Sequence, residues 1–306
     1  MLDRMNLLFR FQAIAEAGSV RKASEVLNIT QPALSRSLGQ LEQAYGQPLL
    51  ERHARGVRPT GFGLRLLSII SRLSRDWELA EHELASGNPG AEGRLRINAG
   101  PLWSAVVLPS VMGQLHRIHP NLTIELNQGA MESVASELLL EGRIDVTFGG
   151  LYVHERDNDQ LATRAFTTVR DRIIARADHP IQSCAPDDYM AVLDYPWIVY
   201  TADPIYEAET LHAIVERTGS APPVRVRSMS LLAVMRLLQD GDYLCILPDV
   251  SVLGLPGRLI RPIPLEMGRR TSPSGARYRR AIAQYEPLQR LLDLCADYFA
   301  NVENPA

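Results

Sequence analysis

The sequence predicts a helical N-terminal domain, a long connecting helix and a larger α/β body. Three observations lead to this fold class. Amphipathic helical periodicity fills most of residues 1–86. The sequence GNPG at residues 87–90 is typical of a linker. Beyond residue 92, short apolar runs alternate with helical patterns, which is typical of α/β domains with mixed sheets. We therefore expect domains with these bounds: 1–60, 61–90 and 91–306.

Two helices are expected at the start of the chain. Apolar side chains recur on one face of residues 2–17, and Gly18 ends that pattern. Ser19 follows, and its hydroxyl is suited to cap a helix over residues 20–27 by accepting a hydrogen bond from an early backbone N–H.

A third helix follows after a very short turn. Thr30 is suited to its N-cap, and Pro32 falls in the first turn, where a missing N–H costs nothing. An inward stripe is spaced by 4, 3 and 4 residues: Leu34, Leu38, Leu41 and Tyr45. The opposite face carries small and polar residues: Gln31, Pro32, Ser35, Arg36 and Gly39.

A basic hairpin and a long helix complete the N-terminal part. Residues 47–60 suit a hairpin with Gly56 at its tip. Residues 61–86 predict a helix with apolar spacings of 4, 3, 4, 3 and 4, a pattern suited to a coiled coil. The expected dimer seam is Leu66, Ile70, Leu73, Trp77, Ala80 and Leu84. A helix packed on its own domain gives similar spacing, but the charged opposite face and the position between domains favour the seam.

The body is expected to alternate strands and helices. The expected strands are 94–100, 122–128, 144–150, 171–176, 197–201, 224–229, 243–248 and 278–284. The expected helices are 104–118, 131–141, 205–218, 230–239 and 286–301. Cys245 lies in one of the apolar strands and is expected in the core.

Charge is distributed unevenly along the chain. Residues 1–75 contain 11 Lys and Arg against 5 Asp and Glu, a net charge of +6, whereas the rest of the chain carries −9. A basic head on an acidic body suggests a polyanionic partner for the head, although a short window can also reach this excess by chance.

Several protein classes find no support in the sequence. The 3 cysteines are too scattered for a disulfide framework, and no secretory signal or membrane-length apolar run is present. We expect a cytoplasmic protein without a membrane association. The sequence has no nucleophile elbow, phosphate-binding loop or HExxH motif. We therefore expect no catalytic residues, no metal site and no cofactor.

The third helix has the chemistry of a DNA reader. Small residues let a helix enter the major groove, where Gln can bind adenine and Arg can bind guanine. Hydroxyls and backbone N–H groups at the helix start can contact phosphates, and the hairpin arginines can follow the backbone. A three-helix protein-interaction module remains an alternative. The DNA-contact residues that we expect are Ser19, Thr30, Gln31, Pro32, Ser35, Arg36, Gln40, Arg52, Arg55 and Arg58.

A family resemblance covers most of the chain. The stretch AGSVRKASEVLNITQPALSRSLGQLEQAYGQPLLERHARGVRPTGFG resembles the winged helix-turn-helix of LysR-type transcriptional regulators. Further along, HPNLTIEL, LLEGRIDVTFG and GDYLCILP resemble the effector domain of that family. The chain departs from the family pattern at four positions, which bear on detail rather than on DNA binding: Ser24, Gly39, Leu50 and Pro59.

The resemblance implies an architecture and partners. It implies a linker-helix homodimer, commonly assembled into a homotetramer, which places recognition helices in successive major grooves of a promoter or operator. RNA polymerase is a further candidate partner. The effector domain is similar to a type 2 periplasmic binding protein, with subdomain I at about 93–166 and 268–300 and subdomain II at about 167–267. A small-molecule effector is then expected between the subdomains.

The resemblance also implies which loops line the effector cleft. Ser104 and Ser228 lie near expected helix starts, where they can either bind an anionic metabolite or only cap a helix. Trp103 is expected to act either as a lid on the ligand or as core. The expected effector-binding residues are Leu102, Trp103, Ser104, Ala130, Met131, Thr201, Ala202, Ser228 and Met229.

Two functions compete with a ligand-responsive regulator. One is a cytoplasmic α/β ligand-binding protein or enzyme that carries an N-terminal protein-interaction module. The other is a solute-binding protein of the cell envelope, which has no use for the basic head. Steeply salt-dependent DNA binding would separate the regulator from both, because only phosphate neutralisation produces it.

Overall fold

The protein is described by a computed structural model that covers most of its chain. The described residues are 2–53, 56–85, 93–128, 132–151, 158–201, 204–248, 259–265 and 271–303. The chain divides into two compact units. The first contains Met1–Ala91 and Leu138–Arg143, and the second contains Glu92–Glu137 and Ile144–Ala306. Below, the head is residues 2–60, and the body is the second unit together with the short segment between its parts.

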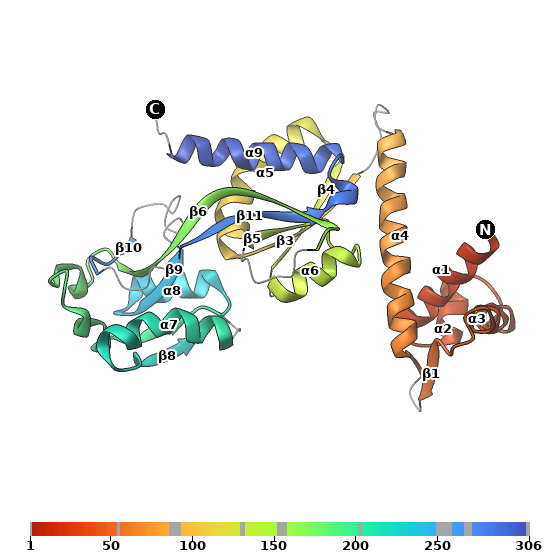
Figure 1. Ribbon diagram of the computed structural model, residues 1–306, viewed down its shortest axis with the longest axis horizontal. Helices are drawn as coiled ribbons and strands as arrows, with labels where there is room; N and C mark the ends of the chain where they lie inside the picture. Colours follow the sequence, from red (N-terminus) through yellow and green to blue (C-terminus); the bar gives the residue numbers. More distant parts are fainter. Residues whose placement is uncertain are drawn as a thin grey trace. The chain divides into compact units, whose positions relative to one another are not determined.

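The head begins with three helices whose ends follow the sequence signals. They are α1 (Leu2–Ala17), α2 (Val20–Val26) and α3 (Gln31–Tyr45), as Figure 1 shows. Backbone N–H groups donate to the side chains of both expected N-caps, Ser19 and Thr30. Gly46 ends α3 in the left-handed conformation with φ of 64°, which glycine adopts without a steric penalty.

A hairpin and a long helix follow the three helices. The hairpin pairs β1 (Leu50–His53) with β2 (Gly56–Pro59), and α4 spans Gly61–Ala85 (Figure 1). The core of the head is built by Phe11 of α1, Leu41 of α3 and Ile70 of α4, all almost fully buried. Burying such side chains contributes about 1.5–3 kcal/mol each, so packing on α1 and α4 holds α3 in place.

The body is built on a mixed sheet in which two long strands join two lobes. The strand order is β4-β3-β5-β11-β6-β9-β7-β8, and β10 pairs with β6 (Figure 1). The strands are β3 (Gly93–Ala99), β4 (Leu122–Gln128), β5 (Val146–Gly150), β6 (Leu161–Arg176), β7 (Trp197–Val199), β8 (Val224–Arg227), β9 (Leu244–Pro248), β10 (Ile260–Pro262) and β11 (Thr271–Arg279).

Strand β6 passes from one lobe to the other. Its residues 161–170 pair with β11, whereas its residues 171–176 pair with β9 and β10. The predicted subdomain boundary at 166–167 therefore falls inside this strand, and the second boundary at 267–268 lies outside the described residues. Strands β3, β4 and β5 are parallel in the first lobe, and β7, β8 and β9 are parallel in the second.

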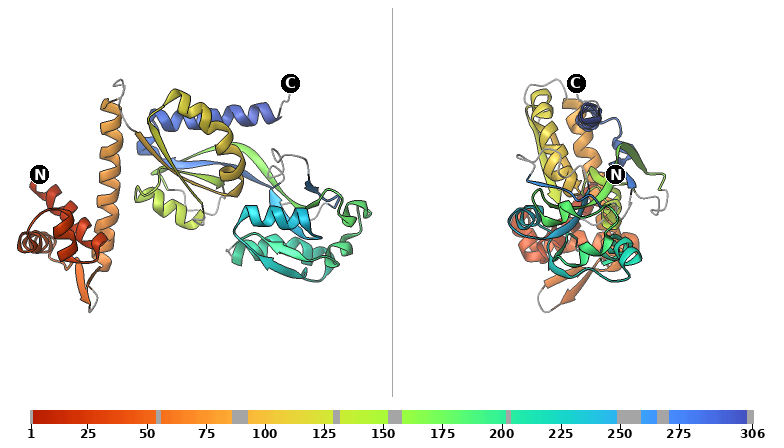
Figure 2. Two further views of the ribbon diagram at one scale, coloured as in Figure 1. Left: turned by 180° about the vertical axis from the view of Figure 1, so that it is seen from behind. Right: turned by 90° about the vertical axis from the view of Figure 1, so that its left-hand side faces the viewer.

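Helices cover the first lobe of the sheet. They are α5 (Leu108–Ile118), α6 (Glu132–Leu140) and α9 (Glu286–Glu303), and a π-helix at Trp103–Val107 precedes α5. Figure 2 shows α5 and α9 side by side on one face of the sheet. The apolar side chains of Ile97 and Phe148, on β3 and β5, are almost fully buried in this lobe.

The second lobe has its own core. Its helices are α7 (Pro204–Thr218) and α8 (Leu231–Asp240), with 3-10 turns at Pro180–Ser183 and Tyr189–Leu193. Trp197, Ile214 and Leu244 are buried in one apolar cluster, and Ile174 and Cys245 in another. Burial raises the pKa of the Cys245 thiol, which agrees with its expected place in the core.

Two strand predictions were wrong in extent. Strand β6 begins ten residues before the expected position 171, because residues 161–170 pair with β11 along an edge that sequence pattern alone does not reveal. The strand expected at 278–284 is instead β11, and Arg280–Ile282 forms a 3-10 turn. In β11, Gly275 lets the backbone bulge past β6, since a Cβ there would lie 2.1 Å from Arg164 O.

Candidate DNA interface and ligand pockets

Helix α3 presents a polar face to solvent. Leu34, Ser37 and Leu41 are its buried residues, and the side chain of Arg10 donates to Ser37 Oγ at 2.7 Å, which ties α3 to α1. The residues expected at the base edges are all exposed: Gln31, Pro32, Ser35, Arg36 and Gln40. Arg36 forms no ion pair with any residue that the structure describes.

Ser19 and Thr30 cap the first turns of α2 and α3, where backbone N–H groups are expected to contact phosphates. Lys22 N donates to Ser19 Oγ at 3.5 Å, and Ala33 N donates to Thr30 Oγ1 at 3.4 Å. Thr30 is exposed at the start of α3, where unpaired N–H groups and the helix dipole favour an anion. Both hydroxyls therefore have a structural role besides the predicted contact with DNA.

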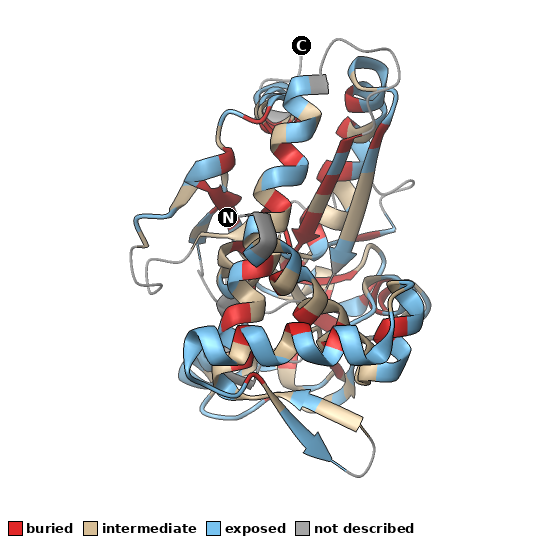
Figure 3. Ribbon diagram, turned by 90° about the vertical axis from the view of Figure 1, so that its right-hand side faces the viewer, coloured by how far each residue is buried: buried red, intermediate tan, exposed pale blue. Residues whose placement is uncertain are grey.

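The hairpin forms a wing that extends from the head. None of its described strand residues is buried, and Arg52 and Arg58 are exposed; Figure 3 shows the exposed hairpin in pale blue and tan. Arg55 lies outside the described residues. Val57 N donates to Gly18 O at 2.9 Å, and a Cβ on Gly56 would lie 2.3 Å from the same oxygen. Glycine is thus required where the wing contacts the turn between α1 and α2.

The apolar face of helix α4 is buried near the start of the helix and exposed further along. Leu66 and Ile70, expected in the dimer seam, are instead covered by Phe11 and Leu41 of the head. The same face continues beyond the head, where Leu73, Trp77 and Leu84 are 41%, 64% and 85% exposed. Ala80 is half-buried. The predicted seam therefore needs a correction at Leu66 and Ile70, because these two residues hold the head together.

Of the two roles expected for Trp103, lid or core, the structure shows the core. Its side chain is 1% exposed and packs against Phe148, Phe166 and Phe299. Its Nε1 donates to Ser274 Oγ at 2.9 Å. Leu102 is also buried. The reason is that the chain enters a helix directly after β3 and turns both side chains inward.

The two serines expected at helix starts do not cap helices. Ser104 lies within the π-helix, and its Oγ donates to Pro101 O at 3.2 Å. Ser228 Oγ accepts from Ser230 N, and Ser230 is the residue that caps α8. Met229 beside it is exposed. The expected residues Ala130, Met131 and Ala202 lie outside the described residues.

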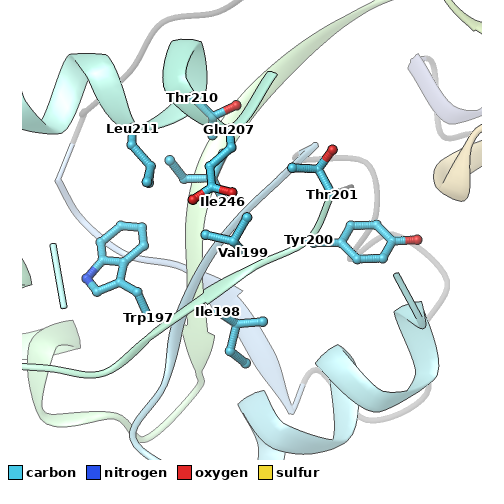
Figure 4. A pocket seen from close by; sticks show the side chains of 9 residues that line it. All are labelled: Trp197, Ile198, Val199, Tyr200, Thr201, Glu207, Thr210, Leu211 and Ile246. Atoms are coloured by element: carbon cyan, nitrogen blue, oxygen red, sulfur yellow. The ribbon is translucent and has the colours of Figure 1, made fainter. Parts of the chain in front are cut away.

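A small hollow in the second lobe includes one expected effector residue, Thr201. It encloses about 280 Å³, open solvent included, and Glu207 and Leu211 of α7 reach toward Val199 of β7 (Figure 4). Glu207 also accepts from Arg227 Nη2 at 2.9 Å. Burial raises the pKa of Tyr200 to about 12, which keeps its phenol neutral. The remaining lining residues are Trp197, Ile198, Thr210 and Ile246.

A larger hollow lies in the first lobe at the ends of β3 and β5. It encloses about 480 Å³, open solvent included. The expected effector set did not include its residues. The glycines at 100, 149 and 150 were visible in the sequence, but the lateral pairing of the strands was not. The lining residues are Asn98, Gly100, Thr147, Phe148, Gly149, Gly150, Leu151 and Arg277.

Two kinds of element are absent from the described part of the chain. In that part of the chain, no group of three or more His, Cys, Asp or Glu side chains is arranged to hold a metal ion. Within the same residues, no helix combines the length and the apolar character needed to cross a bilayer.

Comparison with known proteins gives the family. Residues 5–64 match the bacterial regulatory helix-turn-helix protein of the lysR family, and residues 88–300 match the LysR substrate binding domain. A relative is the SDS degradation transcriptional activation protein of a Pseudomonas species, 28% identical over 81% of this chain and 79% of its own length. The regulator PcaQ of Agrobacterium fabrum is 23% identical over 92% and 90%.

Solved structures share the fold. A full-length variant of OxyR from Pseudomonas aeruginosa aligns with a TM-score of 0.67 at 18% identity, covering 95% of this chain and 97% of that one. CbnR in complex with its target DNA aligns with a TM-score of 0.65 at 19% identity, covering 96% and 99%. The two domain matches together span most of the sequence, and the chain therefore belongs to the LysR family of DNA-binding transcription regulators.

Proposed function

We propose that this protein regulates transcription by binding an operator through α3 and the wing, and that a small molecule bound in its body adjusts that binding. The observation that supports the DNA contact is the exposed face of α3, which carries Gln31, Ser35 and Arg36 on a helix braced from behind by α1. Arginine and glutamine can make paired hydrogen bonds to base edges in the major groove. We place this action in the cytoplasm.

The operator contact is tested by binding to the DNA just upstream of the protein's own gene. Purified protein is titrated against that duplex and against a shuffled duplex of equal length, followed by fluorescence anisotropy. We expect the upstream duplex to bind more tightly at moderate salt. Equal binding to both, together with no sequence enriched by selection from random DNA, would contradict an operator-binding role.

We propose a homodimer through the apolar stripe that α4 exposes beyond the head. Ile69, Leu73, Trp77 and Leu84 are all more than one-third exposed, although burying such side chains stabilises association. Their spacing of about one or two helical turns keeps them on one side of the helix. Two dimers in a tetramer, the arrangement expected from the family resemblance, would place four heads on DNA.

The dimer proposal has a matched control on the same helix. Leu73→Arg places a charge in the stripe, whereas Leu64→Arg changes a leucine that is 58% exposed on the opposite face, about two and a half turns away. We expect Leu73→Arg to shift sedimentation toward monomer and Leu64→Arg to leave it unchanged. Equal sedimentation of both variants and the wild type would overturn the seam.

The effector response requires that ligand binding and DNA binding depend on the same conformational change. A ligand changes DNA binding only if its affinity differs between the two conformations that bind DNA differently. We propose that the ligand changes the angle between the lobes and thereby the bend of the operator. Small-angle scattering of the DNA complex should change on saturation with ligand. An unchanged profile for a ligand that does alter DNA affinity would contradict this mechanism.

No catalytic step is part of the proposal. Contact with RNA polymerase is proposed only as a consequence of binding at a promoter, and a bacterial two-hybrid screen with the polymerase subunits tests it. An interaction lost on deletion of the body and kept on deletion of the head would assign the contact to the body. The absence of any interaction would remove this partner.

A further inference from the structure

A serine lies on the otherwise apolar inner face of α3. The buried residues of this helix are Leu34, Ser37 and Leu41, and Ser37 is 3% exposed. Their spacing of three and four residues puts the three side chains on one face of the helix. A buried hydroxyl is costly unless it is hydrogen-bonded, so the partners of Ser37 show what it contributes.

Ser37 connects α1 to the first turn of α3. Its Oγ accepts from Arg10 Nη1 of α1 at 2.7 Å and donates to Ala33 O at 3.0 Å. Ala33 N donates in turn to Oγ1 of the N-cap Thr30 at 3.4 Å. A continuous series of hydrogen bonds therefore runs from α1 along one side of α3 to its N-terminal turn, which begins with Gln31.

The apolar contacts of α3 hold the helix in place but constrain its rotation less. Leu34 packs in one cluster with Ile14, and Leu41 packs in another with Phe11. Apolar burial is non-directional, whereas a hydrogen bond weakens steeply as its angle departs from linearity. The bond from Arg10 reaches α3 between these two clusters, so it is suited to define the rotation of the helix about its own axis.

Rotation of α3 would move the side chains that are expected to read base edges. An α-helix with its side chains is about 10–12 Å wide, so a rotation of about 10° moves a side chain at its surface by about 1 Å. That shift exceeds the usual spread of N–H···O distances, about 2.7–3.2 Å. Arg36 is adjacent to Ser37 in the sequence, and Gln40 follows one turn later. Discrimination between bases should therefore depend on the rotation more than phosphate attraction does.

We propose that Arg10 is a positioning residue for base recognition. Its hydrogen bond to Ser37 sets the rotation of α3 and thereby determines how well Arg36 and Gln40 align with the base edges of the operator. Arg10 contacts no base in this role. The inference rests on the proposed function, because it requires that α3 reads an operator. It assigns sequence preference to a side chain of α1, outside the set of expected DNA contacts.

Direct contact between Arg10 and DNA is a different role, which the test has to separate. Arg10 is half-buried, and its bond to Ser37 uses one of the several guanidinium N–H groups. A guanidinium that bound a phosphate would add affinity for every duplex and would steepen the salt dependence. Ser37→Ala separates the two roles, since it removes the bond to α3 and leaves the charge of Arg10 in place.

The test compares the tightest duplex from selection on random DNA with duplexes in which single base pairs are changed. Fluorescence anisotropy of the full-length protein at one salt concentration gives the ratio of the two affinities. We expect Ser37→Ala and Arg10→Met to lower this ratio by about tenfold, the discrimination of one base contact. Arg10→Lys keeps a donor and should retain most of the ratio. Arg4→Met, the matched control, removes an exposed arginine of the same helix and should leave the ratio unchanged.

Folding and independence of the two substitutions are checked alongside. Alanine has the highest helix propensity, so Ser37→Ala should keep α3 helical, which circular dichroism and thermal unfolding measure. The double variant of Arg10→Met and Ser37→Ala should lose no more of the ratio than either single variant, because both break the same bond. Losses that add in the double variant would show independent effects and would contradict the link.

The other outcomes are also decisive. An unaltered ratio in folded Ser37→Ala protein would overturn the inference. A changed salt slope in Arg10→Met with a normal ratio in Ser37→Ala would assign Arg10 to direct contact with DNA instead. A wild type without any sequence preference would contradict the proposed function and the inference with it. A preference that the wild type shows and both single variants lose is the result expected.

Discussion

Two arginines of this protein illustrate how burial changes what a charge can bind. Arg36 lies exposed on α3 in the head, where it forms no ion pair with a described residue. Arg277 lies almost buried in β11 of the body, where its Nη1 donates to Ser136 Oγ at 3.3 Å. An exposed arginine acts with its neighbours on an extended polyanion and is screened by salt. A buried arginine is held by the groups packed around it, and salt screens its interactions much less.

The comparison separates reading DNA from sensing a ligand. The head offers an exposed face of polar side chains, and its affinity for DNA accumulates over many weak phosphate contacts. The body offers concave hollows in both lobes, where shape and a few polar groups can select a small molecule. A change in either region should therefore alter one activity strongly and leave the intrinsic chemistry of the other intact.

Salt should produce the largest difference between the two regions. Raising salt from low to physiological concentration should weaken DNA binding by a factor on the order of 10³ or more if six or more phosphates are neutralised. Binding of a small-molecule effector in a hollow of the body should change by much less, because partly buried charges are screened less by salt. Anisotropy and ligand-observed NMR over the same salt series measure the two. Equal salt dependence would contradict the contrast between exposed and buried arginines.

Loss of the aromatic core should affect the body more than the head. Trp103→Ala removes the side chain that contacts Phe148, Phe166 and Phe299, and we expect a loss of about 3–5 kcal/mol in the free energy of unfolding. Trp103→Phe keeps much of the packing but removes the hydrogen bond to Ser274, at a cost of about 1 kcal/mol. Chemical denaturation measures both. Equal losses would show that packing is not the main contribution.

The glycine on the DNA-facing side of α3 should lower the stability of that helix. Gly39 is exposed, and a Cβ there meets no heavy atom within 4 Å. Gly39→Ala should therefore raise the stability of the head by up to about 1 kcal/mol, measured as thermal unfolding. If α3 lies deep in the groove, the added methyl should also weaken operator binding. A destabilised Gly39→Ala protein would contradict the helix geometry.

A buried histidine should give the stability of the body a modest pH dependence. Burial lowers the pKa of His179, which is almost fully buried and accepts from Ile181 N at 3.1 Å. The unfolded chain then binds more protons in the range below about pH 6.5, so stability falls as pH decreases through that range. His179→Asn should flatten this fall, whereas the exposed His212→Asn should not. An unchanged pH profile in His179→Asn would contradict the assignment.

How much the sequence predicts also differs between the regions. In the head, the N-caps Ser19 and Thr30 were predicted and are confirmed, because helix signals are local. The dimer stripe stays a prediction beyond the head. The sequence did not show that the head covers this face at Leu66 and Ile70, since coverage depends on tertiary packing.

In the body, the pocket could not be predicted from local pattern. Asn98 and Arg277 are far apart in the chain and meet only because β5 lies between β3 and β11. Trp103 was assigned two possible roles because its position in the sequence does not show which way the chain turns after β3. The structure assigns it to the core, and it reaches Gly149 through Ser274, whose Oγ donates to Gly149 O at 3.0 Å.

The most direct test of the account is the salt dependence of operator binding for wild type and Arg36→Ala, with Arg236→Ala as an exposed arginine of the body. We expect Arg36→Ala to weaken binding by about 1–3 kcal/mol and to relax sequence preference, and Arg236→Ala to change neither. Operator affinity, sequence preference and salt slope that are all unaltered in Arg36→Ala would contradict the assignment of α3 as the helix that reads DNA.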